Sequence, residues 1–200
     1  MPFRTSSYYR TTTRPVDDDR GQEQKIPRIA VVRPFCLFDF GAVASTFNVW
    51  GDFVPCSALG SRSEVPVDLF LHYSQSYDDA VDDQCQDNVG IIDTIMEMKK
   101  ENANKPDHWT HCFQNIYAIE GRAAREIDLY IPSAQEELNN WISGPNLQFQ
   151  SIYRTIQSGV WGSYMGFYLL EGDVYPRKKY WLDALVSEIL SQKPLAILRG

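Results

Sequence analysis

The sequence alternates short apolar runs with longer stretches in which apolar residues recur at helical spacing. Residues 29–32 and 67–73 are near-continuous apolar runs, typical of strands that are buried on both faces. Between these runs, Val43, Phe47 and Trp50 recur at a spacing that places them on one face of a helix. Strands that alternate with helices predict an α/β fold, with a mostly parallel sheet and helices on both of its faces.

The same alternation continues toward the C-terminus and predicts a Rossmann-like domain. Further helices are expected over residues 76–102, 133–144, 149–156 and 181–190, and further strands over residues 112–119, 164–170 and 195–198. Ser133 and Glu136 form a capping box at the start of the second of these helices. Because the chain stops two residues after the last expected strand, we expect the sheet to be C-terminally incomplete.

Composition divides the chain into a polar tail and one domain. Residues 1–25 contain almost no aliphatic side chains and are expected to form a disordered tail or stalk, whereas residues 26–200 carry the α/β domain. The net charge of −7 argues against a nucleic acid or an anionic membrane surface as partner. No apolar run reaches the ~20 residues of a membrane-spanning helix, and the first ten residues do not resemble a signal peptide.

The chain has four cysteines, namely Cys36, Cys56, Cys85 and Cys112, and no Cys-x-x-Cys pair. An even number is compatible with two disulfides, but the density is far below that of a disulfide-stapled small domain. Cys85 falls on an apolar helical stripe, which favours buried free thiols.

The segment Glu171-Gly172-Asp173 is the candidate site with the clearest chemistry. It follows a fully apolar strand, and ligands of open parallel sheets bind beyond the carboxyl ends of the strands. Two carboxylates separated by a glycine can turn toward one point, where their oxygens suit Mg²⁺ or Mn²⁺ and a bound diphosphate. The alternative interpretation is a solvated turn before Pro176.

An acid-x-acid step at the end of a strand, followed by a proline and a tryptophan-containing helix, resembles the metal site of GT-A glycosyltransferases. The helix that opens with Ser143-Gly144-Pro145-Asn146 is similar to the helix beside the nucleotide sugar in that family. The resemblance covers residues 26–200 and implies the donor-binding half of a nucleotide-diphospho-sugar transferase. Glu171 stands where the family pattern has aspartate, and the half that binds the acceptor would lie beyond Gly200.

The resemblance implies nucleotide-binding roles for five residues that follow strands or open a helix. Pro34 and Phe35 would line the nucleobase pocket after the first strand. Ser74 and Gln75 would lie near the base or the ribose at the end of the second strand. Asn146 would face the ribose and the diphosphate.

The resemblance also implies a metal site and a reaction. Asp173 would bind Mn²⁺ or Mg²⁺, or the sugar-diphosphate directly, with Glu171 in support. The reaction would transfer a hexosyl or pentosyl group from a nucleotide sugar to an unknown glycan or protein acceptor, and no general base is assigned. Enzymes of this family work in the secretory lumen, usually the Golgi, which suggests the same location. The altered first acid leaves a second possibility, a non-catalytic or fragmentary sugar-nucleotide-like interaction domain.

Two other groups of residues suggest different chemistry, a phosphatase nucleophile and a zinc site. The segment around Asp39 is similar to the nucleophile loop of haloacid-dehalogenase-type phosphatases, but Gly41 stands where that chemistry needs a second acid. His111 and Cys112, together with the distant Cys85, could meet at a zinc ion, but their spacing matches no closed zinc pattern.

Overall fold

The structure, a computed structural model, describes residues 28–36, 39–57, 65–76, 97–98, 100–102, 104–105, 107–124, 128, 143–172 and 174–191. Its elements in chain order are β1 (Arg28–Phe35), α1 (Phe40–Asp52), β2 (Val67–Tyr73), a 3-10 helix (Trp109–Cys112), β3 (Ile116–Glu120), α4 (Ser143–Gln157), β4 (Tyr164–Leu169) and α5 (Trp181–Ser191). The expected tail at residues 1–25 and the expected strand at residues 195–198 lie outside the described residues. Most of the helix expected at residues 76–102 and of the one at residues 133–144 also lies outside them.

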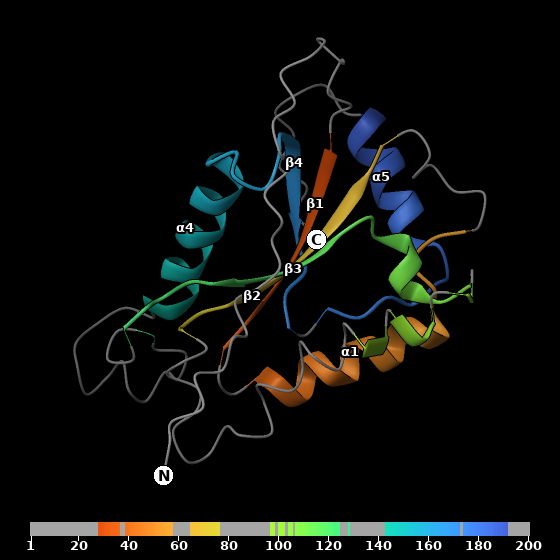
Figure 1. The fold of residues 1–200 in the computed structure, drawn as a ribbon, viewed down its shortest axis with the longest axis horizontal. Coiled ribbons are helices and arrows are strands. Elements are labelled where there is room, and N and C mark those ends of the chain that lie inside the picture. The colour runs from red at the N-terminus through yellow and green to blue at the C-terminus, as the bar shows by residue number, and fades with distance from the viewer. Residues whose placement is uncertain are drawn as a thin grey trace.

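The described strands form one parallel sheet in the order β3-β2-β1-β4 (Figure 1). The chain moves outward from β1 to β2 and β3, and then returns to the opposite side of β1 to form β4. This arrangement confirms the prediction of an α/β domain with a parallel sheet, and it is consistent with a Rossmann-like fold. The direction of strand order reverses between β1 and β4, and open α/β sheets bind ligands at such a switch point.

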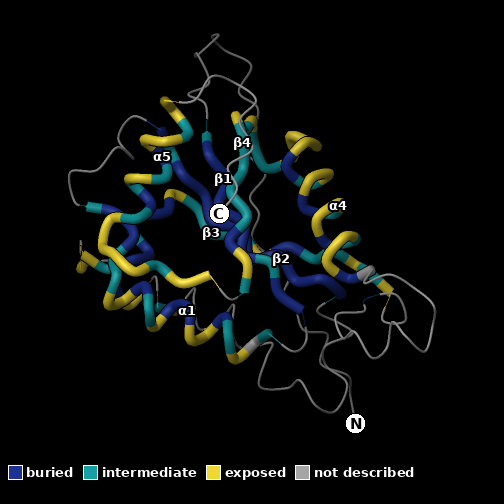
Figure 2. The backbone as a smooth tube through the Cα atoms, turned by 180° about the vertical axis from the view of Figure 1, so that it is seen from behind, coloured by how far each residue is buried: buried dark blue, intermediate teal, exposed yellow. Residues whose placement is uncertain are grey.

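Helices cover both faces of the sheet. Helices α1 and α5 pack on one face against the side chains of Ile29, Val31 and Phe35, whereas α4 packs on the other face against Ala30 and Val32. Successive residues of a strand point to opposite faces, so β1 is buried on both of its sides (Figure 2). The near-continuous apolar runs in the sequence follow from this double cover.

The predicted apolar faces of the helices are the faces that are buried. Val43, Phe47 and Trp50 of α1 lie in the core, as do Leu182 and Val186 of α5. The indole ring of Trp50 lies against Trp109, Phe113 and Trp181, with ring centroids 5.3, 5.7 and 5.4 Å away. Aromatic packing of this kind fixes α1 and α5 relative to the 3-10 helix.

One prediction of secondary structure was wrong at its start. The strand expected over residues 112–119 begins only at Ile116, and Cys112 ends a 3-10 helix instead. Cys112 and Phe113 are buried in the core, so their apolar character reflects packing and not pairing in the sheet.

A buried carboxylate joins three strands at their amino ends, away from the switch point. Asp68 of β2 accepts hydrogen bonds from Arg28 Nη2 of β1 and from the Tyr164 hydroxyl of β4, both at 2.7 Å. Asn115, which precedes β3, donates to the same carboxylate through its backbone and side-chain nitrogens at 3.0 Å. Burial and the bond to Asp68 raise the pKa of Tyr164, so its hydroxyl remains a donor. These bonds satisfy a charge that would be costly to bury alone.

Candidate functional site

A cavity of about 740 Å³ opens at the switch point, beyond the carboxyl ends of β1 and β4. Its walls come from three places in the sequence: the β1–α1 connection, the first half of α4, and the segment after β4. The lining residues are Pro34, Asp39, Ala42, Pro145, Asn146, Gln148, Phe149, Ile152, Leu169, Glu171, Gly172 and Tyr175. The cavity therefore brings together Pro34, Asn146 and Glu171, three of the residues that the sequence analysis singled out.

Asp39 supplies a carboxylate on the β1–α1 side of the cavity. Its Oδ2 accepts hydrogen bonds from the backbone nitrogen and the Sγ of Cys36, both at 3.2 Å. These bonds fix the carboxylate at the start of α1, next to the end of β1. The sequence suggested a phosphatase nucleophile or a loop or helix-capping acid at Asp39, and its place in the cavity was not predicted.

Glu171 supplies a second carboxylate on the β4 side, and the turn behind it is tied to the core. The guanidinium of Arg33 is completely buried, and its Nη2 donates to the Gly172 carbonyl at 3.1 Å and to Thr46 Oγ1 of α1 at 3.2 Å. A Cβ on Gly172 would lie 3.4 Å from Arg33 Nη1, so the glycine leaves room for this approach. Asp173, the predicted metal ligand, lies outside the described residues.

Helix α4 forms a wall whose position is set by one buried amide. Gln148 Nε2 donates to the carbonyl oxygens of Phe35 and His72, both at 3.0 Å, and so joins α4 to the carboxyl ends of β1 and β2. Asn146 lies two residues before Gln148 and Phe149 one residue after it, and both are exposed and line the cavity. The wall therefore presents an amide and an aromatic ring to a ligand.

The remaining predicted contact residues have other surroundings. Phe35 packs in the core, where its ring stacks on Tyr73 with centroids 5.4 Å apart. Ser74 and Gln75 are buried at the end of β2 and both donate to Asp128 Oδ2, at 2.6 and 2.8 Å. No motif in the sequence pointed to Asp128, which lies 54 and 53 positions from its two donors.

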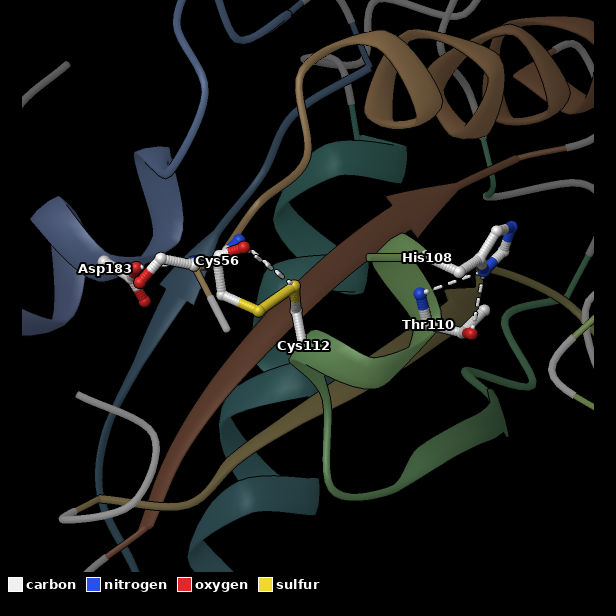
Figure 3. Close-up of a disulfide and its surroundings, with 6 residues drawn as sticks. Cys56, His108, Thr110, Cys112 and Asp183 are labelled. Carbon is white, nitrogen blue, oxygen red and sulfur yellow. Dashed lines mark hydrogen bonds between the residues drawn. A yellow bond between two sulfur atoms is a disulfide. The ribbon is translucent and has the colours of Figure 1, made fainter. Parts of the chain in front are cut away.

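The cysteines are arranged differently from the expectation of free thiols. Cys56, after α1, and Cys112, at the end of the 3-10 helix, form a buried disulfide (Figure 3). Next to it, the backbone nitrogen of Ser57 donates to Asp183 Oδ2 of α5 at 2.8 Å. Cys36 is buried and forms no disulfide with a described residue, and Cys85 lies outside the described residues. The sequence had also left two disulfides possible, but the 56-residue separation of Cys56 and Cys112 gives no local signal of which cysteines pair.

The disulfide also removes the zinc alternative. Cys112 has no thiolate to offer a metal, and His111 Nε2 lies 2.7 Å from the carbonyl oxygen of Asn102. Within the described part of the chain, no three His, Cys, Asp or Glu side chains form a group that could hold a metal by themselves.

Two further observations concern membrane-spanning helices and known proteins. No helix in the described ranges combines the length and the apolar character that crossing a membrane requires. Comparison with protein-family models, with curated proteins and with solved structures finds no match to this chain.

Proposed function

We propose that the chain is the donor-binding part of a GT-A-like glycosyltransferase, which binds a nucleotide-diphospho-sugar at the switch point and transfers the sugar to a glycan or protein acceptor. The cavity beyond β1 and β4 is the observation that carries this proposal. It lies where open α/β sheets bind ligands, and Pro34, Asn146 and Glu171 line it together. Its size falls within the range of small-molecule sites.

The carboxylates in the cavity fit a divalent cation that acts together with a diphosphate. Asp39 and Glu171 both line the cavity, where their carboxylates would serve as oxygen ligands, and Asp173, two positions after Glu171 in the sequence, would be the third ligand. Mg²⁺ is commonly held by one or two carboxylates together with substrate phosphates, so a complete protein cage is not required. A bound Mn²⁺ or Mg²⁺ would neutralise the negative charge that grows on the departing nucleoside diphosphate.

The residues of the chain would position the donor for this reaction. Asn146 would donate hydrogen bonds from its amide to the ribose or the diphosphate. The exposed rings of Phe149 and Tyr175 would cover the apolar faces of the donor. Arg33 would keep the turn after β4 in place through the Gly172 carbonyl, and therefore hold Glu171 at the cavity.

The proposal is tested by thermal unfolding with a panel of nucleoside diphosphates and Mn²⁺. A ligand at 100 times its Kd stabilises a protein by about 2.7 kcal/mol, which raises the Tm of a chain of this size by several degrees. Glu171→Gln should reduce the metal-dependent part of this shift. Glu188→Gln, an exposed matched change on α5, should leave it intact. If the unmutated chain shows no shift with any nucleotide and metal, the proposal is wrong.

The disulfide supports a proposal about location. Disulfides persist in oxidising compartments and are rare where glutathione keeps thiols reduced. Buried pairing of Cys56 with Cys112 therefore favours the secretory lumen, as the resemblance implies. Non-reducing peptide mapping of the protein from its native source would test this, because free thiols at both positions would contradict it.

A further inference from the structure

Asp128 is a buried carboxylate at the carboxyl end of β2, and the described residues donate hydrogen bonds to only one of its two oxygens. The residue is 7% exposed. Ser74 Oγ and Gln75 Nε2 both donate to Oδ2. Oδ1 is also buried, yet it accepts no hydrogen bond from any residue that the structure describes. Two donors therefore converge on one oxygen while the other is left without a donor.

A buried acceptor without a donor needs an explanation. Buried polar atoms in folded proteins almost always have a hydrogen-bond partner, because leaving a desolvated acceptor unpaired is costly. If Asp128 served only to hold the fold together, donors shared between its two oxygens would stabilise its charge better. The arrangement instead resembles a carboxylate that is held by one oxygen so that the other can receive a donor from a ligand.

The backbone around this carboxylate is fixed. After β3, the nitrogen of Gly121 donates to the Tyr73 carbonyl at 2.6 Å, and the nitrogen of Ala123 donates to the Ser74 carbonyl at 2.9 Å. A Cβ on Gly121 would lie 2.5 Å from the Ser74 carbonyl oxygen, so only glycine allows the two segments to approach this closely. Ser74 therefore has a fixed position from which to hold Asp128.

The carboxylate and the switch-point cavity lie on the same edge of the sheet. The backbone nitrogen of Ser74 donates to the Phe35 carbonyl at 3.0 Å, and the same carbonyl accepts a bond from Gln148, a lining residue of the cavity. Strand β1 separates β2 from β4, so the two strand ends are two strand spacings, or about 10 Å, apart. Asp128 is not among the residues that line the cavity and its Oδ1 is buried, so an extended ligand that contacts both places must displace the groups that cover this oxygen.

We propose that Asp128 is the residue that contacts the ligand at the end of β2, and that Ser74 and Gln75 are positioning residues that hold it. Asp128 Oδ1 accepts an N–H or O–H group from the nucleoside part of the donor, while the diphosphate occupies the cavity beside Glu171. This inference rests on the proposed function, and it moves the nucleoside contact from the two residues indicated by the sequence to a third that was not predicted.

The test compares two probes on the full chain by titration calorimetry with Mn²⁺: inorganic pyrophosphate, and nucleoside diphosphates that carry different bases. Asp128→Asn replaces the charged acceptor while nearly conserving its shape. Asp183→Asn is the matched control, because Asp183 also accepts a backbone hydrogen bond but lies on α5. We expect Asp128→Asn to weaken binding of the preferred nucleoside diphosphate at least tenfold, with pyrophosphate binding unchanged. Asp183→Asn should weaken neither.

A second measurement uses the unmutated chain, so it decides the matter even if Asp128→Asn does not fold. The ligands are nucleoside diphosphates that lack the ribose hydroxyls or carry a methylated base N–H. They show which ligand group donates the hydrogen bond to Asp128, and at least one of these changes should lower the binding affinity tenfold or more. If neither does, or if Asp128→Asn binds the nucleoside diphosphate as the parent does, the inference is overturned while diphosphate binding stands. If the parent binds neither probe, the proposed function fails as well.

Discussion

Acidification from pH 7.5 to 4.5 should destabilise the fold through one histidine. His72 of β2 is 1% exposed, and its Nε2 lies 3.1 Å from Ser151 Oγ of α4. Burial disfavours the charged imidazolium and lowers the pKa of His72 from 6.5 to about 4. The folded protein therefore keeps His72 neutral over a range of pH in which the unfolded chain takes up a proton.

The sign and size of the effect follow from this difference. Between pH 6.5 and 4 the unfolded state binds more protons than the folded state. The contribution of His72 to the free energy of unfolding is therefore fully present above pH 6.5, and it is lost as the pH falls toward 4. At 1.36 kcal/mol for each pKa unit, the full loss is about 3 kcal/mol. About 2.5 kcal/mol of it should have appeared by pH 4.5.

The assay is urea unfolding of the parent and of His72→Gln at several pH values between 7.5 and 4.5. Glutamine is neutral throughout and can still exchange a hydrogen bond with Ser151. The difference in unfolding free energy between the two proteins should therefore change by about 2.5 kcal/mol over this range, in favour of the variant at low pH. His108, whose pKa is also lowered by burial, is present in both proteins and cancels in the difference.

The reasoning fails if the two proteins lose stability in parallel as the pH falls. Parallel curves would mean that His72 titrates alike in the folded and unfolded states, so that burial on β2 does not keep it neutral. A variant that is less stable at every pH by a constant amount would have the same meaning, because only the slope reports proton binding.

Three other predictions concern the disulfide, the predicted metal ligand and a close backbone contact. Reducing Cys56–Cys112, or replacing both residues with serine, should lower the unfolding free energy by about 4 kcal/mol, because the bond closes a loop of 56 residues; an unchanged urea midpoint would contradict this. Asp173→Asn should abolish Mn²⁺-dependent binding of nucleotide sugars with the circular dichroism spectrum unchanged, and calorimetry that shows parental affinity would exclude the residue from the site. Gly121→Ala should lower the unfolding free energy by about 1–3 kcal/mol, because its Cβ would overlap a carbonyl oxygen. Gly41→Ala, which meets open space in α1, should be neutral or slightly stabilising in the same melts.

The helices and strands that the sequence predicted correctly are those whose pattern of apolar residues results directly from burial in the core. Strands β1 and β2 are near-continuous apolar runs because helices cover both faces of the sheet there, whereas the apolar strand β4 is only partly buried. Helices α1 and α5 show a clear stripe because each buries one face. The predicted start of β3 was wrong because burial alone does not distinguish a strand from other buried segments. Cys112 is buried at the end of a 3-10 helix, and Phe113 is buried directly after it.

The site could be predicted only as far as the ends of the strands. Pro34 lies one residue before the end of β1, and Glu171 comes two residues after the end of β4, so the rule for parallel sheets located both at the cavity. The partners of Ser74 and Gln75 could not be found in this way, because Asp128 is more than fifty positions away and lies in no recognisable motif. Pairing of Cys56 with Cys112 was inaccessible for the same reason, since the contact exists only after the sheet has formed.

The bonds of Gln148 make the cavity mechanically asymmetric. One wall, α4, is clasped to β1 and β2 by a side chain that bridges two strand carbonyls, so moving this wall would break both bonds together. The opposite wall, which contains Glu171 and Tyr175, belongs to a segment between β4 and α5 that has no regular secondary structure and is largely exposed at its described positions. Within that wall Glu171 is held by the bond from buried Arg33 to the Gly172 carbonyl, whereas Tyr175 is exposed. Differences in fit between ligands should therefore be absorbed around Tyr175, and not at Glu171 or on α4.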